Sequence, residues 1–220
     1  MYTDIVIPNE NEEEFIEIAS KLGYLGICFV YPEKDFKPKN IITKKIDVFF
    51  GVLCEQGDVK RARKKSDFVL VENPEDARLC VEREAPDVIF NFENQSRKDF
   101  IHQRNSGMDH IIARFMEKKG IFSGFSLLSI FEQKEKDVFM GRVMQNIFLL
   151  EKYNTGFLVA SFAKEPYAMK NPEDIASLFS TLGMNKKKAK ASMEKIPLIF
   201  ERNEKIKKGL LGEGIELLHD

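Results

Sequence analysis

Seven short apolar runs, separated by segments of helix length, are the feature that most constrains the fold of this 220-residue chain. The apolar runs lie at residues 4–7, 26–30, 47–53, 67–71, 87–90, 120–126 and 156–161. The helix-length segments between them include residues 12–22, 74–84, 108–119, 137–153 and 172–182. Strands that are apolar throughout are typical of parallel sheets buried on both faces, and alternation of strand with helix is the order of an α/β protein.

The number of alternations bears on the type of α/β fold. Seven units without a Gly-x-Gly-x-x-Gly fingerprint favour a closed or nearly closed barrel over a doubly wound nucleotide-binding sheet. We therefore predict a TIM-barrel-like α/β fold of about seven parallel strands with surrounding helices. Residues 1–208 are expected to form one domain because no linker or composition break interrupts them, and residues 209–220 a Gly-punctuated C-terminal tail.

Two similar segments indicate where helices begin. Asn73 and Asn171 are each followed by Pro-Glu-Asp. Asn is a preferred N-cap, Pro is favoured in the first turn, and acids are stabilised at the positive end of the helix dipole. Both asparagines are therefore predicted to be N-caps.

Charge, hydropathy and cysteines bound the function. The chain has 34 Lys and Arg against 35 Asp and Glu, so any surface for a nucleic acid must be local. No apolar run approaches the ~18 residues that span a bilayer, and the first residues do not resemble an export signal, so we expect a cytoplasmic protein. Cys28, Cys54 and Cys80 lie in apolar segments without CxxC spacing and are predicted to be reduced core residues.

Side chains for catalysis are scarce. The chain has three histidines, and none follows a predicted strand, so a histidine-rich metal cluster cannot be assembled. Glu55, Glu72 and Glu93 do follow predicted strands and could converge on Mg²⁺, because hard cations accept carboxylates alone. Acids in such loops are usually solvated. A metal-dependent barrel phosphoesterase is thus the alternative function.

A local basic cluster follows Asn185. Four of the five residues from 186 to 190 are lysines, and Asn185 is typical of an N-cap. Lys186, Lys187 and Lys188 would then lie at the positive end of a helix, where the macrodipole disfavours cations. A phosphate would relieve this, whereas the structural alternative is a solvated helix face.

An ordered set of motifs indicates a family. From Arg104 the chain reads Arg-Asn-Ser-Gly-Met-Asp-His-Ile-Ile-Ala-Arg, and later Gly-Ile-Phe-Ser-Gly-Phe-Ser-Leu-Leu from Gly120. Then follow, in order, Gly141-Arg142, the strand at 157–161, Ala168-Met169-Lys170-Asn171-Pro172-Glu173-Asp174, Leu182-Gly183-Met184 and Asn203. Over residues 104–203 this order resembles ribonuclease P protein component 3, the archaeal relative of the thirty-kilodalton eukaryotic subunit. The first hundred residues match more loosely.

The resemblance implies a fold and a role. The family is similar in fold to the metal-dependent PHP phosphoesterase barrels, so a PHP-like barrel is expected. The resemblance also implies that the chain pairs with another protein, component 2. It further implies that the chain binds the catalytic RNA of the ribonucleoprotein that removes 5′ leaders from precursor tRNA. Catalysis then belongs to the RNA and its Mg²⁺, so the chain is expected to bind no cofactor and not to be catalytic. A third reading is a pure interaction module that binds component 2 without affecting cleavage.

Residues that match the family pattern are the expected contacts to RNA phosphates or to structural acids. They are Arg104, Arg114, Arg142 and Lys170, with His110 as a further partner. Arg is common in the family where Lys170 stands, so a bidentate phosphate contact would become a point charge. Lys164 follows a Phe where small residues are usual, and Arg202 is chosen by position alone. Replacing Arg104 or Arg142 with Ala is expected to weaken RNA-dependent activity with the fold intact.

Overall fold

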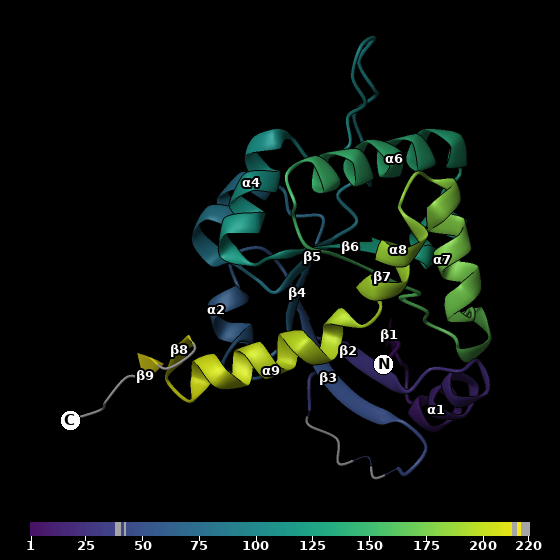
Figure 1. Cartoon of the computed structure of the whole chain (residues 1–220), viewed down its shortest axis with the longest axis vertical. Helices are drawn as coiled ribbons and strands as arrows, with labels where there is room; N and C mark the ends of the chain where they lie inside the picture. Colours follow the sequence, from purple (N-terminus) through teal and green to yellow (C-terminus); the bar gives the residue numbers. More distant parts are fainter. Residues whose placement is uncertain (38–40, 42, 213–214, 217–220) are drawn as a thin grey trace.

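A sheet of seven parallel strands in chain order forms the centre of the molecule (Figure 1). The computed structural model describes residues 1–37, 41, 43–212 and 215–216. The strands are β1 Thr3–Val6, β2 Gly26–Pro32, β3 Asp47–Cys54, β4 Val69–Glu72, β5 Val88–Phe90, β6 Phe122–Ser126 and β7 Phe157–Ala160. Each pairs in parallel with the next. The strands predicted from the seven apolar runs are confirmed.

The first strand meets the segment that follows the last strand, which nearly closes the sheet into a barrel. Val6 and Ala163 form a parallel bridge. The N–H of Ile7 donates to the carbonyl of Ala163, and the N–H of Phe162 donates to the carbonyl of Ile5, both at 2.8 Å. The side chain of Asp4 accepts the N–H of Ser161 at 2.7 Å. The predicted TIM-barrel-like fold is thereby confirmed.

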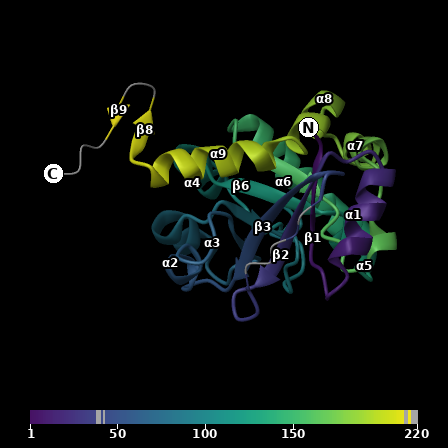
Figure 2. The same cartoon turned by 90° about the horizontal axis from the view of Figure 1, so that it is seen from below.

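Side chains that alternate along the strands face either the barrel interior or the helices outside it. The barrel interior holds Ile5, Cys28, Val30, Phe68, Leu70, Val88, Phe90, Leu158, Ala160 and Phe162. Phe162 has a positive φ of 51°, and its ring stacks on Phe90 with centroids 4.4 Å apart. At the other end, α9 (Lys195–Lys207) lies across the barrel and contributes Ile196 and Ile199 to this interior (Figures 1 and 2).

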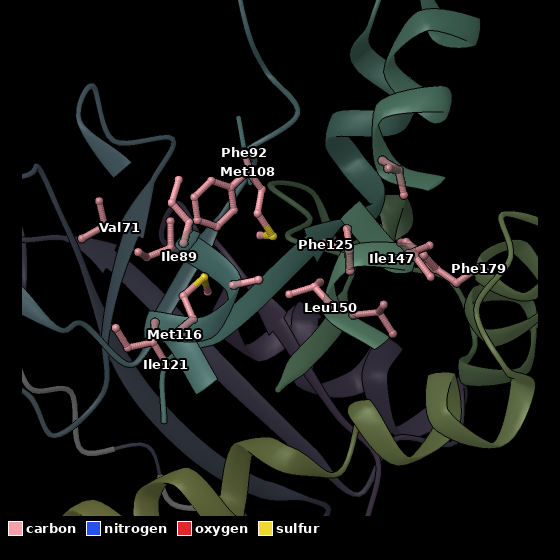
Figure 3. Close-up of a cluster of buried hydrophobic side chains, with 14 of the residues drawn as sticks. Val71, Ile89, Phe92, Met108, Met116, Ile121, Phe125, Ile147, Leu150 and Phe179 are labelled. Carbon is pink, nitrogen blue, oxygen red and sulfur yellow. The ribbon is translucent and has the colours of Figure 1, made fainter. Parts of the chain in front are cut away.

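Helices cover the outside of the barrel. They are α1 Glu12–Lys21, α2 Val59–Ala62, α3 Ala77–Leu79, α4 His110–Lys119, α5 Leu127–Glu132, α6 Lys136–Lys152, α7 Pro172–Thr181 and α8 Lys186–Ser192, with a π turn η1 at Cys80–Glu84 and a 3₁₀ turn η2 at Pro166–Ala168. Figure 3 shows the cluster beneath α4, α6 and α7, to which β6 contributes Phe125, α4 Met116, α6 Leu150 and α7 Phe179. The ring centroids of Phe125 and Phe179 lie 5.7 Å apart. This packing fixes α4 and α6, which carry His110, Arg114 and Arg142.

The two predicted N-caps have different outcomes. Asn171 caps α7 as predicted, because its side chain accepts the N–H of Asp174 at 2.9 Å. Asn73 does not cap a helix. Its amide donates to the carbonyl of Asn94 at 2.7 Å, and Asp76 is the N-cap of α3 instead. The prediction for Asn73 is wrong because a contact with the next loop uses its side chain.

Three smaller predictions concern the cysteines, the membrane and the C-terminal tail. All three cysteines are free and buried, as predicted. No helix in the described part of the chain is long and apolar enough to cross a membrane. In the predicted tail, β8 (Leu210–Gly212) pairs antiparallel with β9 (Ile215–Glu216), whereas residues 213–214 and 217–220 lie outside the described residues.

Candidate nucleic-acid interface

Residues 91–109, which we call the β5–α4 loop, leave the carboxyl end of β5 and project from the barrel near α6 (Figure 1). Arg142 of α6 holds the base of this loop. Its guanidinium donates to the carbonyls of Glu93 at 3.1 Å, Gln95 at 2.8 Å and Arg97 at 2.7 Å. Its Nε donates to Asp99 Oδ1 at 2.8 Å.

This geometry settles the partner of Arg142. Its side chain is only 7% exposed. The sequence left open whether Arg142 would contact an RNA phosphate or a structural acid. The structure shows the acid, Asp99, so Arg142 is not available to an RNA phosphate. Removal of Arg142 would cost the loop four hydrogen bonds, so we expect it to destabilise the loop, while the expectation that the barrel itself stays folded remains a prediction.

A second layer of polar contacts supports the same loop. The amide of Asn146 donates to Glu93 Oε1 at 2.8 Å and to the carbonyl of Ser106 at 2.9 Å. The Gln145 side chain accepts the N–H of Arg104 at 3.1 Å and donates to its carbonyl at 3.0 Å. Burial raises the pKa of Glu93 to about 7 against the lowering effect of the Asn146 hydrogen bond. The loop is therefore fixed by side chains of one helix.

Arg104 lies at the edge of this network. Its Nη1 pairs with Asp99 Oδ2 at 3.2 Å, and its guanidinium packs against Gly141, where an added Cβ would lie 2.3 Å from the Arg104 Cζ. Burial raises the pKa of Asp99, but hydrogen bonds from Arg142 and from the N–H of Asn105 together lower it by more. The pKa of Asp99 therefore lies below its usual value. The Arg104 side chain is 47% exposed, and a phosphate contact by it stays a prediction.

His110 and Arg114 gather around one tyrosine. The Arg114 guanidinium carbon lies 5.1 Å from the ring centroid of Tyr153, and the His110 ring is 6.4 Å from the same ring. Both residues are exposed on α4. Asp109, the residue before His110, caps α4 by accepting N–H groups of the first turn. Arg114 thus presents its charge on an aromatic surface.

The two lysines after β7 are exposed, and one of them has a fixed backbone. The carbonyl of Lys170 accepts the hydroxyl of Tyr24 at 2.9 Å. Its Nζ lies 3.3 Å from the carbonyl of Met169. Lys164 is exposed as well. An RNA contact by either lysine stays a prediction.

The lysines of α8 have partners in neighbouring helices. Asn185 caps α8 as predicted, its Oδ1 accepting N–H groups of the first turn. Lys186 lies 3.9 Å from Glu173 of α7, and Lys188 lies 3.2 Å from Glu151 of α6. Lys187 has no ion pair among the described residues. Carboxylates already offset part of the unfavourable charge, which weakens the case for an external anion.

Arg202 belongs to a buried polar network at the opposite end of the barrel. Its Nη2 pairs with Asp87 Oδ1 at 2.9 Å, and its Nη1 donates to the carbonyl of Gly120 at 2.7 Å. Asp87 is 2% exposed and also pairs with Arg63 and accepts the amide of Asn203. Arg202 is therefore occupied by structural partners.

The barrel mouth carries more acids than bases. A cavity of about 700 Å³ is lined by Pro32, Glu33, Lys34, Leu53, Cys54, Glu55, Asp58, Arg61, Glu72, Asn73 and Asn94. Four of these residues are acidic and two are basic. Hydrogen bonds from Arg61 and Lys65 hold the pKa of Glu33 at about 2, so its charge persists. An RNA backbone is disfavoured at this mouth.

The three glutamates of the alternative function have separate roles. Glu93 is buried and bonded to Asn146, and Glu72 accepts the amide of Asn91 at 2.7 Å. Glu55 is exposed. No group of three or more His, Cys, Asp or Glu that could hold a metal ion is found among the residues that the structure describes.

Sequence reasoning missed the residues that build the β5–α4 loop. They are Asp99 in the loop and Gln145 and Asn146 in α6. Their partners lie about forty residues away in the chain or are backbone carbonyls, which leave no local pattern. The apolar pair Phe100-Ile101 within a polar stretch is the one signal that could have drawn attention to this loop.

Comparison with known proteins gives consistent matches along the chain. A family model described as RNase P subunit p30 matches residues 1–208. Ribonuclease P protein component 3 of Methanococcoides burtonii is 23% identical, covering 93% of this chain and 87% of that protein. The protein of the same name from Methanococcus maripaludis is 26% identical, covering 95% of both.

Two solved structures share the fold. A chain in the cryo-EM structure of archaeal ribonuclease P with mature tRNA has a TM-score of 0.73 at 19% identity and covers 98% of both chains. Histidinol phosphate phosphatase from Lactococcus lactis, crystallised with zinc, L-histidinol and phosphate, has a TM-score of 0.56 at 8% identity and covers 92% of this chain and 93% of that one. At these identities the likeness shows the barrel fold alone.

Proposed function

The chain belongs to the RNase P subunit p30 family, and we propose that it supports the catalytic RNA of ribonuclease P in removing 5′ leaders from precursor tRNA. The family match over residues 1–208 is the observation that carries this proposal. The matches to relatives named ribonuclease P protein component 3 cover most of this chain and most of each relative. Component 2 is the partner protein that we propose, and the cytoplasm is the proposed location.

The distribution of charge supports an RNA surface on the outside of the barrel. Arg104, Arg114, Lys164 and Lys170 are exposed, whereas the barrel mouth is lined by an excess of acids. Phosphates are attracted to exposed cations and repelled where carboxylates outnumber cations. We therefore place the RNA contact at the β5–α4 loop and α4.

In this proposal the chain contributes charge and shape, and the RNA with its Mg²⁺ contributes the chemistry. The chain neutralises phosphates that would otherwise repel one another and so lowers the Mg²⁺ that the RNA needs. The alternative, a barrel phosphoesterase, needs Glu55, Glu72 and Glu93 to converge on a metal. The partners of Glu72 and Glu93 in the structure favour structural roles for both.

Two assays separate the three readings. Purified chain is analysed for metal content and for phosphatase activity without RNA, where a stoichiometric metal with RNA-independent activity would overturn the proposal. Precursor tRNA cleavage is then measured with catalytic RNA and component 2, adding or omitting the chain. We expect faster cleavage with the chain. Binding to component 2 without any effect on cleavage would instead identify a pure interaction module.

A further inference from the structure

The tip of the β5–α4 loop exposes two large apolar side chains. Phe100 is 68% exposed and Ile101 is 95% exposed. A turn closes the tip, in which the N–H of Phe100 donates to the carbonyl of Gln103 at 2.8 Å. Figure 1 shows the loop extending away from the helices around it. Apolar side chains held in water at the end of a projection mark a site of interaction.

The base of the loop is too well anchored for this exposure to be incidental. Arg142 donates four hydrogen bonds to the loop, and Gln145 and Asn146 fix the chain that returns from the tip. All these contacts lie below Phe100 and Ile101. The structure thus holds the tip away from the barrel on a stem of ordered hydrogen bonds.

The charges beside the tip are positive. Arg97 and Lys98 precede Phe100 and are exposed. Asp99, the acid between them and the tip, has both carboxylate oxygens engaged, by Arg142 and Arg104. The tip therefore presents two cations and an aromatic ring together. This charge complements a polyanion, whereas an apolar pocket on a protein would have to desolvate both cations.

We propose that Phe100 stacks on an unpaired base of the catalytic RNA while Arg97 and Lys98 contact the flanking phosphates. This inference rests on the proposed function and adds the kind of RNA element that the loop binds, a single-stranded or bulged segment. Proteins bind such segments by stacking bases on aromatic side chains beside cations, since every base has a π face. Ile101, at the same tip, packs against the neighbouring base or sugar.

The proposal separates stacking from charge, and a salt series measures both. Affinity of the full chain for the catalytic RNA is determined from low to high salt for wild type, Phe100→Ala, Phe100→Trp and the double variant Arg97→Ala/Lys98→Ala. Tyr167→Ala is the matched control, since Tyr167 is an aromatic residue 75% exposed on η2.

Each variant has its own expected result. Phe100→Ala weakens binding about 5- to 150-fold without changing the slope of log affinity against log salt. Phe100→Trp retains affinity because the indole also stacks. The double variant flattens the slope by about 1.4 to 1.8, at about 0.7 to 0.9 for each phosphate. Tyr167→Ala binds as wild type, and an equal loss in this control would contradict the inference.

Chemical probing of the RNA identifies the partner of Phe100. Unpaired bases protected by wild-type chain should become reactive with Phe100→Ala, whose unfolding in urea should match wild type because the residue is exposed. If wild type binds RNA and Phe100→Ala binds equally well, the inference fails and the proposed function stands. If wild type itself does not bind, the proposed function fails. A Phe100→Ala defect confined to component 2 binding makes the tip a protein contact and overturns the inference.

Discussion

Replacing Arg142 with Met removes the anchor of the β5–α4 loop while keeping a long side chain in its place. The change leaves three backbone carbonyls, those of Glu93, Gln95 and Arg97, without their donor and removes one partner of Asp99. Leaving a buried backbone carbonyl without its donor costs about 1–3 kcal/mol in free energy of unfolding. Opening of the loop to water offsets part of this cost, so we expect a loss of about 2–4 kcal/mol.

Two further variants sharpen this prediction. Arg142→Lys keeps the charge but lacks the planar fork that reaches several acceptors at once, so its loss should be intermediate. Arg114→Met removes an exposed arginine from α4 and should cost less than about 1 kcal/mol.

The prediction is checked by urea unfolding together with amide hydrogen exchange. Exchange of residues 95–106 should become much faster in Arg142→Met, while strands of the barrel keep their relative protection. Wild-type stability and unchanged exchange of the loop in Arg142→Met would show that the network does not hold the loop, and the reasoning would be wrong.

Three more variants test separate parts of the account. Glu93→Gln should stabilise the fold by about 2–3 kcal/mol at pH 8 and change little at pH 4.5. The pKa of Glu93 is raised from 4.5 to about 7 on folding, so the wild-type protein loses stability as pH rises through that value, whereas Gln carries no charge to bury. Equal effects of the substitution at both pH values in urea titrations would contradict this. Changing Lys186, Lys187 and Lys188 to Ala should flatten the salt slope of RNA binding by about two units with the melting temperature held or raised, and a lower melting temperature would instead indicate that the intrachain pairs matter. Gly141→Ala should keep or raise stability, because Ala favours helix. The added Cβ should displace the Arg104 guanidinium and so weaken RNA binding. Unchanged RNA affinity would show that Arg104 does not contact the RNA.

The strands were predictable from the sequence because both faces of the parallel sheet are buried, one against the barrel interior and one against the helices. Val88, Ile89 and Phe90 are all apolar although successive side chains face opposite ways, into the interior and toward the helices. Such runs are visible without any knowledge of partners. Helix caps were predictable only where the side chain stayed local, as at Asn171, and not at Asn73, whose amide is used by another loop.

The candidate site was less predictable because its contacts are long range. Arg142 binds carbonyl groups more than forty residues away, and every residue has a carbonyl, so no pattern of side chains announces this anchor. Lys186 and Lys188 look unpaired in the sequence, but the barrel brings Glu173 and Glu151 beside them. Composition and spacing located the cations, whereas their partners depend on the tertiary fold.

A magnesium titration of precursor tRNA cleavage tests the proposed function most directly. Catalytic RNA and component 2 are held constant, and the rate is measured against Mg²⁺ with and without this chain. We predict that the chain shifts the midpoint to lower Mg²⁺ and that the difference in rate disappears at high Mg²⁺, because the metal then screens the same phosphates. Identical titration curves with and without the chain would contradict the account.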